Sequence, residues 1–292
     1  MYLKICVCIV LITSMSFIFY PVNKCTVFVS CTTGLGDLMF ETFSAVSIVL
    51  LSGCEHANVI TSYTREHGYY NLSRIQSPYF TYYPAEKYNW VKKPQYTLPW
   101  SSKVFNPECG IKDYKWVSSM YMHTEEKTIH TMKQVSSSIY LDKCNDRTVD
   151  ISVHSRRGDK IKTKWSSVTS LRYNYDKFTL WLINNKIQHI SLASDDHKWA
   201  VRYIKELKLH SIQVTYKKNS AIEDLCMLHK SRMVVRLGTA STFSAISAIL
   251  GHVNLSVIGP NVSDHVSIRE YNRAHDMDMH WIHSGILNIT VL

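Results

Sequence analysis

Short apolar strands alternate with helices through residues 149–258, and this alternation limits the fold more than any other feature of the sequence. Val149, Ile151 and Val153 alternate with polar residues, a pattern typical of a half-buried strand. Helical segments and further apolar strands follow in turn, which predicts an α/β fold with a parallel sheet and crossover helices. The expected strands are 149–153, 188–193, 211–216, 233–237 and 252–258, and the expected helices are 175–184, 198–207, 222–229 and 245–250.

Polar residues follow three of these strands. Because the carboxyl ends of parallel strands meet at one edge of a sheet, these residues should lie together. Adjacent arginines offer planar donors suited to phosphate, and hydroxyls with free N–H groups at a helix N-terminus bind anions. Each segment has an ordinary alternative, either a solvated arginine turn or helix capping by the Asp pair or Ser241. The three segments are His154–Asp159, Ser194–Asp196 and Gly238–Ser244.

A second turn of this kind lies near the start of the chain. Residues 25–31 are expected to form a strand and Leu38–Leu51 an apolar helix, with Gly34 and Gly36 between them. Glycines before a helix let an anion approach the backbone closely, although many such turns are only structural.

Residues 60–120 differ in character, since they are rich in Tyr, Trp and Pro and have poor periodicity. We expect either an irregular region that packs aromatic side chains or a binding surface for a carbohydrate or peptide acceptor. Residues 121–145 are expected to be helical and polar, and their end marks the boundary between two halves, 25–145 and 146–292.

The first 24 residues predict membrane insertion. Lys4 precedes an apolar run from Ile5 to Tyr20, and the bulky residues at its end favour an uncleaved signal anchor over a cleaved signal peptide. The rest of the chain would then lie in the secretory lumen, where cysteines form disulfides. The lumenal cysteines are Cys25, Cys31, Cys54, Cys109, Cys144 and Cys226, and the N-glycosylation sequons are at Asn71, Asn254, Asn261 and Asn288.

The charge of the chain favours an anionic partner. There are 33 Lys and Arg against 23 Asp and Glu, for a net charge of +10. The basic residues are spread out and not clustered with aromatic residues, so nucleic-acid binding is not expected. The cysteines and histidines lack zinc-ligand spacing, so no metal site is expected either.

Four of these segments resemble motifs of the α-1,2-fucosyltransferases, glycosyltransferase family 11, including its nematode branch. His154-Ser155-Arg156-Arg157-Gly158-Asp159 is similar to the family's His-x-Arg-Arg-x-Asp. The others are Thr33-Gly34-Leu35-Gly36-Asp37-Leu38-Met39-Phe40, Leu192-Ala193-Ser194-Asp195-Asp196 with Trp199, and Asp224-Leu225 through Ser241-Thr242-Phe243-Ser244. They occur in family order and span residues 33–250.

The resemblance implies a GT-B-like fold, with two Rossmann-like halves facing a cleft behind the membrane anchor. It implies metal-independent, inverting transfer of fucose from GDP-fucose to a galactose hydroxyl of a glycan, without a cofactor, in a single-pass type II Golgi protein; a secreted form is the alternative. Arg156 would bind the β-phosphate and act in catalysis. The other implied donor-binding residues are His154, Arg157, Asp159, Gly34, Gly36, Ser194, Asp195, Asp196, Ser241, Thr242 and Ser244. For Arg157 two roles stay open, since it would either contribute to the donor site or face the fold.

The chain departs from the family pattern at three places. Asp37-Leu38 replaces Asn-Gln, Ala240 replaces an Asn, and Ala245-Ile246 replaces a Trp pair. Asp37 would repel a pyrophosphate unless it faces the acceptor as a catalytic base. These departures leave a rival hypothesis, a family member that binds a glycan or nucleotide in the secretory pathway without catalysis. A secreted structural protein with incidental motifs is a third hypothesis.

Overall fold

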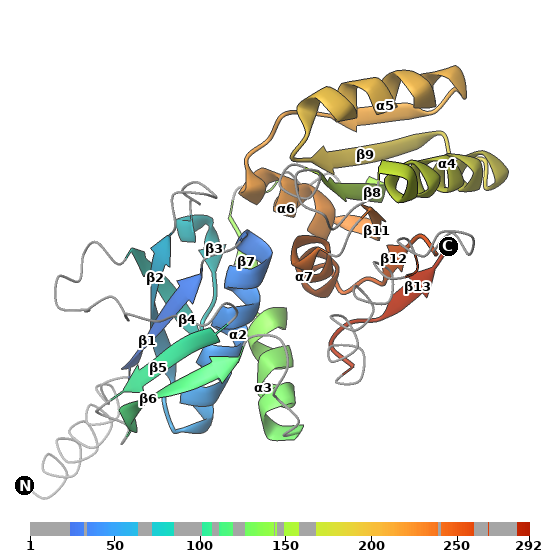
Figure 1. Ribbon diagram of the computed structural model, residues 1–292. Helices are drawn as coiled ribbons and strands as arrows, with labels where there is room; N and C mark the ends of the chain where they lie inside the picture. Colours follow the sequence, from blue (N-terminus) through green and yellow to red (C-terminus); the bar gives the residue numbers. More distant parts are fainter. Residues whose placement is uncertain are drawn as a thin grey trace, which may run out of the picture.

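The computed structural model describes residues 24–31, 34–63, 72–84, 101–106, 111–118, 126–142, 144, 149–157, 168–238, 241–259, 268 and 285–292. Two larger sheets organise these residues, one formed before residue 119 and the other after residue 148 (Figure 1). The expected anchor at 1–24 lies outside the described residues except for Lys24. Among the helices of the described residues, none has the length and apolar character needed to cross a bilayer.

The C-terminal sheet confirms the predicted alternation. Its six strands run in the order β10-β9-β8-β11-β12-β13, and every neighbouring pair is parallel. Its strands are β8 (Val149–Arg156), β9 (His189–Ser194), β10 (Gln213–Tyr216), β11 (Ser231–Gly238), β12 (Leu255–Val257) and β13 (Ile289–Val291). Its helices are α4 (Val168–Asn184), α5 (His197–Leu209), α6 (Ala221–His229) and α7 (Thr242–Leu250).

Three details differ from the expectation. Helix α4 begins at Val168 and not at Tyr175, through residues whose β-branched and polar side chains gave no helical signal. Strand β12 is confined to Leu255–Val257, and β13 was not expected. β13 is a short edge strand, and its exposed residues give little apolar pattern to detect.

The N-terminal sheet is mixed. Its order is β4-β2-β1-β5-β6, in which β1, β2 and β4 are parallel and β5 and β6 are antiparallel. Residues 60–120 are therefore not wholly irregular: they include β4, β5 and β6, and the β5–β6 hairpin adds strands at one edge of the sheet. The strands are β1 (Lys24–Cys31), β2 (His56–Tyr63), β4 (Phe80–Pro84), β5 (Ser101–Asn106) and β6 (Ile111–Ser118).

Helices of the two sheets pack against each other. Helix α2 (Leu35–Leu51) crosses the N-terminal sheet and also contacts α7, while α3 (Glu126–Ser137) contacts both. The expected polar helix at 121–145 is thus shorter, and it is followed by β7 (Tyr140–Leu141), which pairs with β3 (Ile75–Gln76) beside the short η2 turn (Leu72–Arg74).

A single apolar cluster, which we call the shared core, joins the two sheets. It includes Val27 of β1, Phe43 of α2, Leu225 of α6 and Ile246 of α7. Helices α4 and α5 cover the opposite face of the C-terminal sheet with a separate cluster around Phe178 (Figure 1). The C-terminal sheet is therefore buried on both faces, as parallel sheets usually are.

A disulfide joins the segment between the sheets to the C-terminal half. Cys144 is bonded to Cys226 of α6, with 5.3 Å between their Cα atoms. Arg74 donates from Nε to the Asp142 carbonyl and from Nη2 to the Cys226 sulfur, and Lys230 donates to the Cys144 carbonyl. The connection is thus bonded to both halves.

Candidate functional site

The two arginines at the end of β8 lie on opposite faces of the sheet. In a strand, successive side chains point to opposite faces. Ile151 and Val153 pack in the cluster beneath α4 and α5, and Ser155 continues that face by sharing a hydrogen bond with Tyr175 of α4. His154 contacts Phe243 of α7 with 5.1 Å between ring centroids, so His154 and Arg156 face α2 and α7.

Helices α2 and α7 begin against each other beside Arg156. A Cβ placed on Gly36 would lie 2.5 Å from the Phe243 nitrogen, so only glycine fits at this crossing. A Cβ on Gly34, the residue that precedes α2, would lie 3.8 Å from Nη1 of Arg156. Two helix N-termini, each favourable to anions, therefore converge on one guanidinium group.

His154 is a buried polar residue at this site. Its side chain is 7% exposed, and its Nδ1 has no hydrogen-bond partner among the described residues. Burial lowers the pKa of His154 to about 3, with further lowering by the charges of Arg156 and Arg236. The imidazole is therefore neutral at physiological pH, and a buried nitrogen without a partner is costly unless a ligand or water satisfies it.

Arg236 was not predicted as a site residue. It pairs in register with His154, lies on the same face of the sheet and is 5% exposed. The sequence signal was an arginine within the apolar strand Met233–Leu237, a position where a charge is rarely buried without a partner. Arg236 and Arg156 thus lie on the same face of the C-terminal sheet, toward α7.

The start of α7 leaves one hydroxyl available. Ser241 occupies the position before the helix, but its side chain makes no capping hydrogen bond. It is 3% exposed, and Oγ has no partner within the described part of the chain. The Ser244 hydroxyl instead donates to the Ser241 carbonyl at 3.0 Å, and Thr242 is buried in the first turn. Ser241 is therefore the hydroxyl best placed for an anion.

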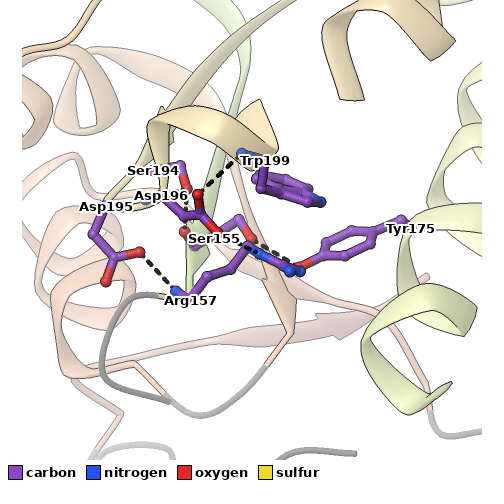
Figure 2. Close-up of polar contacts among 7 residues, drawn as sticks. All are labelled: Ser155, Arg157, Tyr175, Ser194, Asp195, Asp196 and Trp199. Atoms are coloured by element: carbon purple, nitrogen blue, oxygen red, sulfur yellow. Dashed lines mark hydrogen bonds and ion pairs between the residues drawn. The ribbon is translucent and has the colours of Figure 1, made fainter. Parts of the chain in front are cut away.

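Ser194, Asp195 and Asp196 contact Ser155 and Arg157, the two residues that flank Arg156 in sequence (Figure 2). Ser194 Oγ donates to the Ser155 carbonyl at 2.9 Å, and the Arg157 backbone N–H donates to Asp195 Oδ1 at 2.6 Å. Asp196 caps α5 by accepting from the Trp199 N–H. The capping alternative for the Asp pair is thus confirmed for Asp196.

The Arg157 side chain points away from Arg156. Its Nη1 donates to the Tyr175 hydroxyl at 2.6 Å, and its Nε pairs with Asp196 at 3.4 Å. The guanidinium carbon lies 4.9 Å from the Trp199 ring centroid. Its donor groups point toward Tyr175 and Asp196 on the α4–α5 side of the sheet (Figure 2), opposite to the face on which Arg156 lies.

The residues that depart from the family motifs lie in different parts of the structure. Asp37 is 4% exposed in the first turn of α2, so its carboxyl is buried at the site and not in solvent. Ala245 and Ile246 are fully buried in the shared core, where they pack and do not line the site. Ala240 lies outside the described residues, as does Asp159 of the arginine motif.

Asp224, in the first turn of α6, is a further carboxyl near this edge. Burial raises the pKa of Asp224 to about 7, with smaller raising contributions from Glu223 and Asp195, while Asn219 donates to Oδ1 at 3.0 Å. Helix α6 lies in the shared core, on the same side of the sheet as α7. The sequence motif contained Asp224, but nothing in the pattern predicted that the carboxyl would be half-buried.

Two predicted glycosylation sites are accessible. Asn254 and Asn288 are exposed and directly precede β12 and β13, whereas Asn71 and Asn261 lie outside the described residues. Among the described residues no cluster of three or more His, Cys, Asp or Glu side chains is placed to hold a metal.

No protein-family model matches the sequence, and no curated protein matches it either. Three similar solved structures are the α-1,6-fucosyltransferase NodZ with GDP, POFUT1 with GDP-fucose, and the E. coli heptosyltransferase WaaC with ADP. NodZ has 12% identity and a TM-score of 0.46, over 78% of this chain and 92% of that chain. POFUT1 has 10% identity and a TM-score of 0.49, over 79% of this chain and 94% of that chain. WaaC has 10% identity and a TM-score of 0.41, over 89% of this chain and 99% of that chain. At these values the likeness carries no argument about function.

Proposed function

We propose that this protein is a glycosyltransferase of the GT-B architecture that uses GDP-fucose as its donor. The observation that carries the proposal is the convergence of Arg156 with the N-termini of α2 and α7. Phosphate oxygens suit such a site, because guanidinium groups and free backbone N–H groups both stabilise them. The ordered resemblance of four motifs to α-1,2-fucosyltransferases supplies the choice of nucleotide sugar.

The residues around Arg156 have distinct roles in this proposal. Arg156 binds the β-phosphate, and Ser241 donates its hydroxyl to a phosphate oxygen. The neutral His154 bonds to the donor through Nδ1, which has no partner within the described residues. Asp224 accepts from the two N–H groups on the Watson–Crick edge of guanine, a pattern that adenine does not offer. Each role uses a group that is buried or half-buried at this edge of the sheet.

The transfer itself places a negative charge on GDP. A galactose hydroxyl oxygen attacks the anomeric carbon of fucose while the bond from that carbon to the β-phosphate oxygen breaks. The hydroxyl proton passes to a base, and GDP leaves with the electron pair of the broken bond. Arg156 and the two helix N-termini stabilise the developing charge, a contribution that is often the largest in catalysis. Attack from the face opposite GDP inverts the anomeric centre, and an α-1,2 linkage is the product we propose.

Asp37 determines which of two functions the site supports. Its buried carboxyl is placed in the α2 turn beside the proposed phosphates. As the base it would accept the acceptor proton, and we propose it in that role. If its charge instead opposes the pyrophosphate, the protein is a nucleotide- or glycan-binding member of the secretory pathway without activity, which is the second candidate function.

We also propose that the catalytic part lies in the Golgi lumen behind the N-terminal anchor. The Cys144–Cys226 disulfide supports an oxidising compartment, because such bonds persist there and are rare in the cytosol. The acceptor is a glycan that ends in galactose. Exposed Asn254 and Asn288 would carry N-glycans in the same compartment.

The test measures GDP binding by calorimetry and GDP release from GDP-fucose with galactosides, using the full-length chain. Arg156→Ala should abolish release and weaken GDP binding at least tenfold, by loss of about 1.5–3 kcal/mol of charge-assisted bonding. The matched control is Arg232→Ala, because Arg232 is 79% exposed and pairs with Asp150 at the other end of the sheet. GDP binding without release on any acceptor supports the second candidate, and no GDP binding by the wild type refutes the donor site.

A further inference from the structure

Arg156 is flanked on both sides by peptide groups that bond to Ser194, at the end of β9, and to Asp195, directly after it. The Ser155 carbonyl accepts from Ser194 Oγ at 2.9 Å, and the Arg157 N–H donates to Asp195 Oδ1 at 2.6 Å. Figure 2 shows these two bonds at Ser155 and Arg157. One bond precedes Arg156 in the chain and the other follows it, so the backbone of this single residue is held relative to the neighbouring strand.

The Arg157 side chain adds a third attachment on the far face of the sheet. Its guanidinium group bonds to Tyr175 and pairs with Asp196, and it is 11% exposed. Asp196 is itself held by the Trp199 N–H, and its own N–H bonds to Ser194 Oγ at 3.2 Å. These contacts leave the Arg157 side chain little freedom to move. Because Arg156 directly precedes Arg157, its backbone at the end of β8 is restrained with it.

We propose that Ser194, Asp195 and Asp196 act as positioning residues for Arg156, and not as contacts to the nucleoside. This inference rests on the proposed donor site, since it assigns how that site is built. A backbone held in advance fixes the direction in which the Arg156 side chain leaves the strand, so less backbone entropy is lost when phosphate binds. The Asp pair thereby contributes to anion binding although its own charge is negative.

If the Asp pair contacts the nucleoside instead, its variants should affect the binding of different ligands. A carboxylate that bonds to ribose or guanine matters for GDP but not for a ligand without a nucleoside. A carboxylate that positions Arg156 matters equally for GDP and for inorganic pyrophosphate. The two ligands therefore separate the roles in one set of variants.

The experiment measures the Kd of GDP and of inorganic pyrophosphate by calorimetry with the full-length wild type and with Asp195→Ala, Asp195→Asn and Ser194→Ala. We expect Asp195→Ala and Ser194→Ala to raise both constants by the same factor, about tenfold. Asp195→Asn should restore most of the affinity, because its amide oxygen still accepts from the Arg157 N–H. Asp150→Ala is the control and should change neither constant, because Asp150 lies at the other end of β8 from Arg156 and is 78% exposed.

Three results would overturn the inference. A loss of affinity for GDP alone would assign Asp195 to the nucleoside. An unchanged Kd for both ligands would remove any role in binding. Failure of Asp195→Asn to restore the affinity would show that the charge of Asp195, and not its hydrogen bond, matters. These results leave the donor site itself intact as long as the wild type binds GDP. A wild type that binds neither ligand refutes the proposed function, and the inference with it.

Discussion

Gly36 and Phe243 lie so close that a side chain on Gly36 would overlap the Phe243 backbone. The 2.5 Å separation joins a hypothetical Cβ on α2 to a backbone nitrogen on α7, two segments more than 200 residues apart in sequence. Neither partner is a flexible side-chain end, so the helices themselves would have to move.

Gly36→Ala should therefore separate the two helix N-termini. We expect a loss of about 1–3 kcal/mol in the free energy of unfolding, the range for overpacked sites, and weaker GDP binding. Urea denaturation and calorimetry measure the two effects. Gly34→Ala is the matched control for stability, since its nearest neighbour would lie at 3.8 Å, an ordinary contact distance. Equal stability of the two variants would contradict the close crossing.

GDP affinity should depend on pH through Asp224. Burial raises the pKa of this carboxyl to about 7, and only its ionised form accepts both guanine N–H groups. The Kd for GDP should therefore be constant above pH 8 and rise as the pH falls below 7, approaching tenfold per pH unit. Asp224→Asn should bind more weakly and lack this dependence. A wild-type Kd that is flat from pH 8 to 6 would remove Asp224 from the base-binding role.

Acid should destabilise the protein partly through His154. Burial lowers the pKa of His154 to about 3, from 6.5 in the unfolded chain, so below pH 6.5 the unfolded state takes up a proton that the folded state refuses. The resulting loss is about 2 kcal/mol at pH 5 and is absent at pH 7.5. His154→Gln should lose less stability than the wild type between those pH values, as measured by urea denaturation.

Other groups titrate in the same range, so the comparison between variants is what isolates His154. Burial lowers the pKa of His229 to about 4, which adds acid sensitivity of the same sign, and the raised pKa of Asp224 acts in the opposite direction. His210→Gln is the control, because that side chain is exposed. If both His variants change the pH dependence equally, burial of His154 is not the cause.

Removal of the Cys144–Cys226 disulfide should be costly. The bond closes a loop with a sequence separation of 82 residues. Its loss in the Cys144→Ser, Cys226→Ser double variant should lower the free energy of unfolding by about 4 kcal/mol, since the unfolded chain gains freedom. Denaturation with urea measures the change, and Ser73→Ala at the adjacent turn, which keeps the bond, serves as the control. A loss below about 1 kcal/mol would show that the unfolded chain is compact without the bond.

The C-terminal sheet and much of its site could be predicted from the sequence. The period of two that identified β8 through Val149, Ile151 and Val153 also places Ser155 and Arg157 on the same face. Continued by two residues, that pattern separates Arg156 from Arg157, whereas the motif left open whether Arg157 binds the donor or faces the fold. Strand periodicity thus contained more information about the arginine pair than the motif did.

The remaining features depend on packing between distant segments. No local pattern shows that Gly36 meets Phe243, or that Asp224 is half-buried with a raised pKa. The mixed N-terminal sheet was missed for another reason: the β5–β6 hairpin lies at a sheet edge, where an apolar run is not required. Such strands leave a weaker periodic signal than the buried strands of the C-terminal sheet.

The shared core has a consequence for any attempt to divide this protein. A chain cut near residue 145 would leave Phe43 on one fragment and Ile246 on the other, each with an apolar surface open to water. Neither fragment would be expected to remain soluble by itself, and mixing them should restore a folded pair. The two halves would then behave as obligate partners that happen to be joined by a peptide chain.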